Sequence, residues 1–169
     1  FYEQKILKGY EKKTDGRLVS YILGKENLEQ CHQIARWAKE QGLAYKELYW
    51  TGWEIPSLNE HLNGFFHISV PEWLNAIRNA EYVLTNSFHC AVFAILFRKK
   101  FMVLNNPSGG LDRILTLLGL LRLKQRYLSD LIQSDRLLER LENPIDYERV
   151  QKDLEACRKD SLAFLVNIR

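Results

Sequence analysis

Three short, nearly continuous apolar runs constrain the fold of this chain more than any other feature. They cover residues 18–23, 81–85 and 100–104, and each is followed by a segment whose apolar residues recur at helical spacing. A strand that is apolar on both faces needs cover on both sides, which is typical of parallel sheets flanked by helices. The alternation of such strands with helices therefore predicts an α/β fold, a Rossmann-like doubly wound parallel sheet.

The remaining segments complete this alternation. Further strands are expected at residues 46–51 and 65–69, and a loop between them at 52–64. Helices are expected at 28–41, 70–80, 87–98, 111–121, 135–141 and 147–166, with a short one at 128–131. Asn27, Ser69 and Asp146 have the side chains that cap helix N-termini. We expect residues 1–16 to be a linker or N-terminal extension and residues 17–169 to be one domain.

Composition excludes several classes of protein. The chain has 169 residues, 46% hydrophobic and 27% charged, with a net charge of +3 and no dense basic run, so no nucleic-acid partner is expected. Cys31, Cys90 and Cys157 lack metal-ligand spacing, which indicates buried reduced thiols and a cytoplasmic protein. No stretch approaches the ~20 apolar residues of a membrane span.

The polar turn between the run at 81–85 and the helix at 87–98 is the first candidate site. Loops that follow the carboxyl ends of parallel strands hold ligands in such sheets, and a helix N-terminus attracts anions. His89 lies in the first helical turn, where it is a candidate catalytic acid or base, or else only a local packing residue. Asn86 and Ser87 are candidates for capping the helix and for binding an anion. His32, His61 and His67 are weaker catalytic candidates.

A second candidate is Arg113, which follows the loop at 105–110. An arginine in the first turn of a helix opposes the helix dipole, so a role in binding carboxylate or phosphate is one interpretation. A surface ion pair, for example with Asp112, is the other. Arg122 and Arg126 could line the same edge of the sheet or be solvated. Phosphate-loop, nucleophile-elbow and metal-binding motifs are absent from the sequence.

One block of sequence, over roughly residues 66–127, contains two motifs that together carry a family resemblance. Its first part is Pro71-Glu72-Trp73-Leu74-x-x-Ile77-x-x-Ala80-x-x-Val83-x-Thr85-x-Ser87-Phe88-His89, followed by an apolar helix and a strand. Its second part is Arg113-Ile114-x-x-Leu117-Leu118-Gly119-Leu120, with Arg126 shortly after. This block resembles the polysaccharide pyruvyl transferase family well, and the strand and helix of residues 17–42 resemble it loosely.

The resemblance implies a chemistry and an architecture. Pyruvate would pass from phosphoenolpyruvate, the donor substrate, to a sugar hydroxyl pair of a cell-surface polysaccharide or its lipid-linked precursor, with no cofactor or metal. The chain would be the C-terminal lobe of a two-lobed, glycosyltransferase-like (GT-B-like) fold, and a missing N-terminal lobe would form the other wall. His89 would be catalytic, and Asn86, Ser87, Phe88 and Arg113 would bind substrate, although some family members have arginine in place of Ser87. The reaction would occur in the cytoplasm, at the inner face of the cell membrane.

Two other functions remain open from the sequence. The domain could be a glycosyltransferase lobe that binds a nucleotide sugar at the same edge of the sheet. It could also be a non-catalytic α/β interaction module, in which case no concave basic pocket would surround His89.

Overall fold

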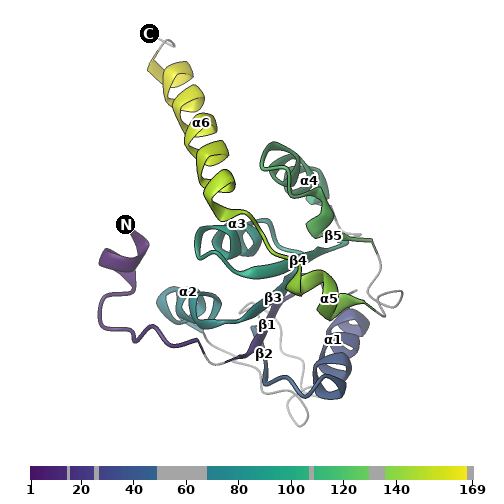
Figure 1. The fold of residues 1–169 in the computed structure, drawn as a ribbon. Helices are drawn as coiled ribbons and strands as arrows, with labels where there is room; N and C mark the ends of the chain where they lie inside the picture. Colours follow the sequence, from purple (N-terminus) through teal and green to yellow (C-terminus); the bar gives the residue numbers. More distant parts are fainter. Residues whose placement is uncertain (15, 25–26, 49–67, 107–108, 130–135, 167–169) are drawn as a thin grey trace.

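The computed structural model describes residues 1–14, 16–24, 27–48, 68–106, 109–129 and 136–166. Within these residues a five-stranded sheet forms the centre of the molecule, in the order β2-β1-β3-β4-β5 (Figure 1). Every pairing in it is parallel. The strands are β1 (Leu18–Tyr21), β2 (Tyr45–Leu48), β3 (Tyr82–Thr85), β4 (Lys100–Leu104) and β5 (Tyr127–Leu128).

Helices cover both faces of the sheet. They are α1 (Leu28–Glu40), α2 (Val70–Asn79), α3 (Phe88–Leu96), α4 (Leu111–Leu120), α5 (Leu137–Glu142) and α6 (Tyr147–Val166), with a π-helix η1 (Tyr2–Ile6) and a 3-10 helix η4 (Lys124–Arg126). Alternate strand residues face opposite layers: Val83 and Phe101 pack with α2, α3, α4 and the start of α6, whereas Leu84 and Met102 pack with α1 and α5. The Rossmann-like, doubly wound parallel sheet predicted from the sequence is confirmed.

The strand order determines where a ligand can approach. From β1 the chain first moves outward to β2 and then returns to the other side of β1 as β3. Sheets with this order bind ligands in the crevice at the reversal, beyond the carboxyl ends of the two strands that flank it. The loop after β1 and the turn after β3 meet at that position.

Most helix and strand boundaries agree with the sequence-based expectations to within a few residues. Ser69 forms a capping box with Glu72, and Asp146 accepts a hydrogen bond from the Arg149 N–H at 3.0 Å, as expected of caps. Asn27 occupies the N-cap position of α1, but its side chain donates to the Leu23 carbonyl at 2.6 Å instead of capping the helix.

Two further predictions were less accurate. The expected short helix at 128–131 is wrong at its start, because Leu128 pairs with Leu104 of β4 as part of β5. The expected strand at 65–69 lies mostly outside the described residues, as do 49–51 of the second strand and the loop at 52–64, and Ile68 and Ser69 are not in a strand.

Arg126 is the largest difference from the sequence-based interpretation. It does not line the ligand edge and is not solvated, since only 1% of it is exposed. Its guanidinium donates to the carbonyls of Arg140 at 2.9 Å, Leu141 at 3.5 Å and Asn143, and so binds the C-terminal end of α5. Carbonyls at a helix C-terminus lack intrahelical donors, so a buried cation there satisfies them. Arg122, by contrast, is exposed, with Asp153 at 3.7 Å.

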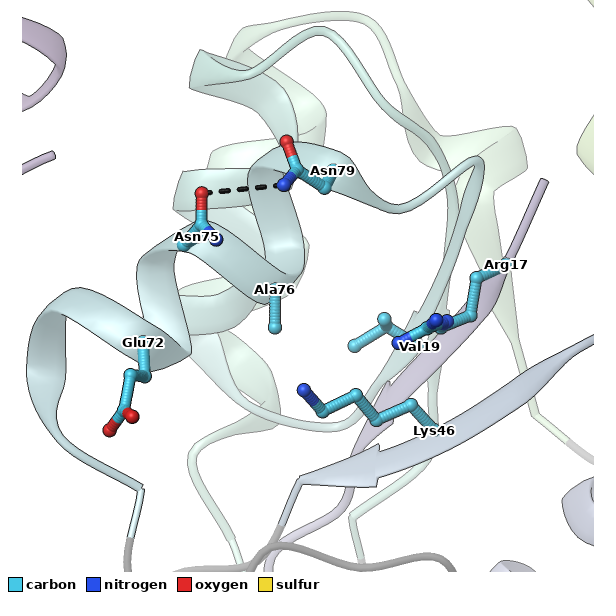
Figure 2. A pocket seen from close by; sticks show the side chains of 7 residues that line it. All are labelled: Arg17, Val19, Lys46, Glu72, Asn75, Ala76 and Asn79. Carbon is cyan, nitrogen blue, oxygen red and sulfur yellow. Dashed lines mark hydrogen bonds between the residues drawn. The ribbon is translucent and has the colours of Figure 1, made fainter. Parts of the chain in front are cut away.

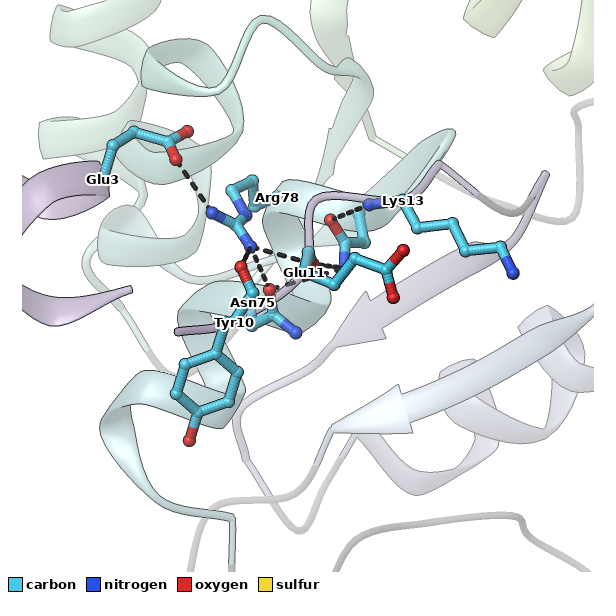
Figure 3. A network of polar contacts seen from close by, with 7 residues as sticks. Glu3, Tyr10, Glu11, Lys13, Asn75 and Arg78 are labelled. Carbon is cyan, nitrogen blue, oxygen red and sulfur yellow. Dashed lines mark hydrogen bonds and ion pairs between the residues drawn. The ribbon is translucent and has the colours of Figure 1, made fainter. Parts of the chain in front are cut away.

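Residues 1–14, the N-terminal segment, pack against α2 and α3. Leu7 is 2% exposed, and the Tyr2 ring lies edge-on to Phe93 with ring centroids 4.9 Å apart. Arg78 of α2 holds the segment through polar contacts (Figure 3): its guanidinium binds the Glu3 carboxylate at 2.8 Å and the carbonyls of Tyr10 and Glu11, both at 3.0 Å.

Candidate functional site

The turn after β3 is attached to β1 by a buried threonine. The Thr85 hydroxyl donates to the Tyr21 carbonyl at 2.6 Å and accepts the Ser87 N–H at 3.0 Å. Thr85 is completely buried, so these bonds do not compete with water. This one side chain therefore connects the end of β1, the end of β3 and the start of the turn.

Asn86 adds a second connection between the same two loops. Its Oδ1 accepts the Leu23 N–H at 2.7 Å and its Nδ2 donates to the Leu23 carbonyl at 2.8 Å. Asn27 donates to the same carbonyl and lies 3.5 Å from Oδ1 of Asn106, in the loop after β4. The loops that follow β1, β3 and β4 are thus joined by asparagine side chains.

Ser87 is the residue that caps α3. Its Oγ accepts the Cys90 N–H at 3.5 Å, and Ser87 itself is only 3% exposed. Of the two capping candidates in the sequence, the serine has this role. Asn86 is equally buried, at 1% exposed, so the polar atoms of both side chains serve the turn in this structure.

The helix that follows, α3, places a cysteine side chain in the core. Cys90 is completely buried, and burial raises the pKa of its thiol to about 12, so the thiol stays protonated at neutral pH. Cys31 is also buried, and all three cysteines are free, as expected from their spacing, but Cys157 is only partly buried, contrary to the expectation.

His89, Phe88 and Arg113 form the exposed part of the site. His89 and Arg113 are exposed and Phe88 is half-buried. The Phe88 and His89 rings are nearly perpendicular with centroids 5.7 Å apart, and Cζ of Arg113 lies 5.5 Å from the Phe88 centroid, in cation–π range. Phe88 thereby contacts both candidate functional side chains. Among the described residues, Arg113 makes this ring contact and no ion pair.

The residue that precedes α4 is a glycine with a left-handed backbone. Gly110, the N-cap of α4, has a φ of +80°, which favours glycine. A Cβ at this position would lie 3.4 Å from a guanidinium nitrogen of Arg113. That distance is an ordinary van der Waals contact, so position 110 is restricted by its backbone conformation and not by its neighbour.

The site as a whole suits an anion. The helices α3 and α4 both begin here, and a helix N-terminus carries about half a positive charge and N–H groups without intrahelical acceptors. The Arg113 guanidinium adds a full charge. An exposed imidazole beside these groups can exchange protons with a bound substrate.

The comparison with known families bears directly on this turn. The family model described as polysaccharide pyruvyl transferase matches residues 12–108, more than half of the chain. The chain belongs to the polysaccharide pyruvyl transferase family. The match confirms the resemblance found in the sequence and supports a transferase. No curated protein matches the chain.

The family match and the sequence resemblance overlap, but their bounds differ. The match includes β1 to β4 and the turn with His89, but it stops before α4 and Arg113. The sequence resemblance covered residues 66–127 well but residues 17–42 only loosely, and so gave too little weight to the first strand. It also missed Thr85 as the residue that joins β1 to the turn. A hydroxyl at the end of an otherwise apolar strand was the available signal.

Other predicted site features are placed as follows. His32 lies on α1, with its Nδ1 3.9 Å from Glu29, while His61 and His67 are outside the described residues. Within the described ranges no group of three or more His, Cys, Asp or Glu side chains is arranged to hold a metal ion. Among the helices described, none combines the length and the apolar character needed to cross a membrane.

Proposed function

We propose that this chain is one lobe of an enzyme that transfers a pyruvyl group from phosphoenolpyruvate to two hydroxyls of a sugar, forming a ketal. The acceptor is a cell-surface polysaccharide or its lipid-linked precursor. The observation that carries the proposal is the family match over residues 12–108, which includes the turn where His89 lies exposed at the reversal of the sheet.

The reaction balances without an oxidant or reductant. The methylene carbon of phosphoenolpyruvate gains a proton and becomes a methyl group. Both sugar oxygens form bonds to the central carbon, whose bond to the phosphate oxygen breaks. The two sugar hydroxyls release two protons. One balances the proton that the methyl group gains, and the other leaves with inorganic phosphate.

The exposed residues of the turn suit these steps. A histidine side chain can deliver a proton to carbon or remove one from a hydroxyl. Arg113 and the first-turn N–H groups of α3 stabilise the departing phosphate. The Phe88 ring contacts both the Arg113 guanidinium and the His89 ring. Asn86 and Ser87 complete the substrate-binding residues, and they reach a ligand only by exchanging the hydrogen bonds described above.

The proposal includes a second wall for the site. Because His89 and Arg113 lie on an exposed surface, a GT-B-like arrangement with a second lobe of the same protein would enclose the substrate. The second lobe would supply further cationic groups for phosphoenolpyruvate. The enzyme would work in the cytoplasm, at the inner face of the membrane where lipid-linked saccharides are built.

Acceptor-dependent release of phosphate tests this function. The full-length protein is incubated with phosphoenolpyruvate and a lipid-linked oligosaccharide or polysaccharide acceptor, and free phosphate and acceptor mass are followed together. Both should change in equal amounts. Turnover of a uridine or guanosine diphosphate sugar without consumption of phosphoenolpyruvate would instead identify a glycosyltransferase, and no turnover of either donor would indicate a non-catalytic module.

A further inference from the structure

A cavity separate from the His89 turn lies between α2 and the sheet, beside β1 and β2. Its volume is about 250 Å³ (Figure 2). Arg17, which directly precedes β1, and Lys46 of β2 line it from the sheet side. Glu72, Asn75 and Ala76 line it from the helix side. None of its lining residues belongs to the turn after β3.

The pairing of β1 and β2 explains why a cation faces this cavity. Val19 and Lys46 are paired in the parallel register, so their side chains leave the sheet on the same face. Val19 is buried in the core layer that includes α2, and thus Lys46 also projects toward α2. The helix presents a small residue, Ala76, at this level, so the space above Lys46 is not filled.

The polar groups around the cavity are mainly hydrogen-bond donors. Arg17 and Lys46 bring two positive charges, and both also have other contacts within the chain. Asn75 uses its Oδ1 to accept from Arg78 at 2.6 Å and from Asn79 at 3.4 Å, which leaves its amide nitrogen as the group for a ligand. An anion is the ligand that such a donor set favours.

One hydrogen-bond acceptor and two apolar side chains in the cavity restrict which anions it can bind. Glu72 accepts from the Ser69 hydroxyl at 2.6 Å and from its N–H at 2.9 Å, and these bonds hold the pKa of the carboxyl below its ordinary value, so it is ionised at neutral pH. The carboxylate can accept hydrogen bonds from hydroxyl groups of a ligand, while the two cations beside it bind a negatively charged group of the same ligand. Val19 and Ala76 supply apolar surface for a sugar ring.

From this arrangement we propose that the cavity binds one carboxylated sugar residue of the glycan acceptor. The sugar carboxylate lies between Arg17 and Lys46, and its hydroxyls donate to Glu72. This inference rests on the proposed function, because it assumes a glycan acceptor. It adds that the acceptor is acidic and is held at a second place on the lobe, away from the reacting hydroxyls.

Titration calorimetry on the full-length protein tests the site, with D-glucuronate, D-glucose and inorganic phosphate as probes. Glucuronate should bind, and glucose and phosphate should bind at least tenfold more weakly. The double variant R17Q/K46Q should weaken glucuronate binding at least tenfold. The control R36Q/K39Q removes two exposed charges from α1, on the other side of the sheet, and should change the affinity less than twofold.

A variant that leaves the charge unchanged distinguishes binding in the cavity from a general electrostatic attraction of glucuronate to the protein. Ala76→Leu fills the space from α2 and should weaken glucuronate binding at least tenfold, while circular dichroism shows the helix content unchanged. Glucuronate affinity that survives either R17Q/K46Q or Ala76→Leu would overturn the proposal. So would equal binding of glucose, equal binding of phosphate, or no binding of glucuronate.

The result can be separated from the test of the proposed function. His89→Gln should leave glucuronate binding intact, because His89 does not line the cavity. Pyruvyl transfer by a protein that does not bind glucuronate would overturn this inference alone. Glucuronate binding by a protein that does not use phosphoenolpyruvate would contradict the proposed donor but leave an acidic-sugar site.

Discussion

The side-chain amide of Asn86 pairs with both backbone polar groups of Leu23, at 2.7 Å to the N–H and 2.8 Å to the carbonyl. The asparagine side chain offers one hydrogen-bond acceptor and one donor to the neighbouring backbone, as the backbone of an adjacent strand would. The turn that carries His89 is therefore connected to the loop after β1 at the reversal of the sheet. Its shape is determined by contacts with another loop as well as by its own sequence.

Substituting Asn86 should loosen the turn. In Asn86→Ala the Leu23 N–H loses its acceptor, while the carbonyl keeps its bond from Asn27. We expect a loss of about 1–3 kcal/mol in the free energy of unfolding, measured by urea denaturation. Asn86→Asp should be at least as harmful, since an oxygen then faces the Leu23 carbonyl. Full stability in both variants would contradict the role described for this amide.

Arg126 should contribute more to stability than any exposed arginine. Arg126→Ala leaves the carbonyls of Arg140 and Asn143 without their cationic donor, so unfolding by urea should require about 2–4 kcal/mol less. Arg126→Lys keeps the charge but not the planar group of donors, and should recover only part of this loss. Arg122→Ala is the control. Its side chain is 72% exposed, so it should cost no more than about 1 kcal/mol.

Arg78 should control the attachment of the N-terminal segment. Arg78→Ala removes the bonds to Glu3, Tyr10 and Glu11, so amide hydrogen exchange within residues 2–11 should become faster while β3 and β4 stay protected. Arg98→Ala removes an exposed ion pair with Glu148 and should leave that exchange unchanged. Slow exchange in the Arg78 variant would show that Leu7 and Tyr2 hold the segment without this arginine.

The contacts of Glu142 predict that the stability of the fold depends on pH in the acid range. Glu142 accepts a hydrogen bond from Tyr82 and pairs with Lys100 at 2.9 Å, and these contacts lower the pKa of its carboxyl from the ordinary 4.5. A carboxyl with a lowered pKa in the folded state stabilises the fold above pH 4.5 and loses that effect as the pH falls through its folded value. Thermal melts at pH 3 to 7 should therefore show a gap between wild type and Glu142→Gln that narrows below pH 4.5. A gap of constant size would contradict the linkage.

The features that could be predicted from the sequence are those determined by residues close to one another in the chain. The strand at 100–104 was correct to the residue, and the turn at Asn86 to His89 was correctly located, because apolar runs and capping residues act locally. Arg126 was misread because its burial depends on the C-terminal end of α5, which lies 14 to 17 residues away in the chain.

The composition of the site was only partly predictable. Phe88 and His89 share a turn, but the contact of the Phe88 ring with Arg113 depends on how α4 packs beside α3. Ser87 as a cap followed from its residue type. The two bonds from Asn86 to Leu23 could not be predicted, because the strand order had to bring β1 beside β3 first.

The most direct test of the account is the rate of pyruvyl transfer by the full-length protein with His89→Gln. If His89 is the acid–base group, kcat should fall by about 100-fold or more, with circular dichroism and unfolding unchanged. Arg113→Gln should instead raise KM for phosphoenolpyruvate more than it lowers kcat, because the arginine binds the phosphate in both the ground state and the transition state. Wild-type turnover by the His89→Gln protein would contradict the assignment of the turn after β3 as the catalytic site.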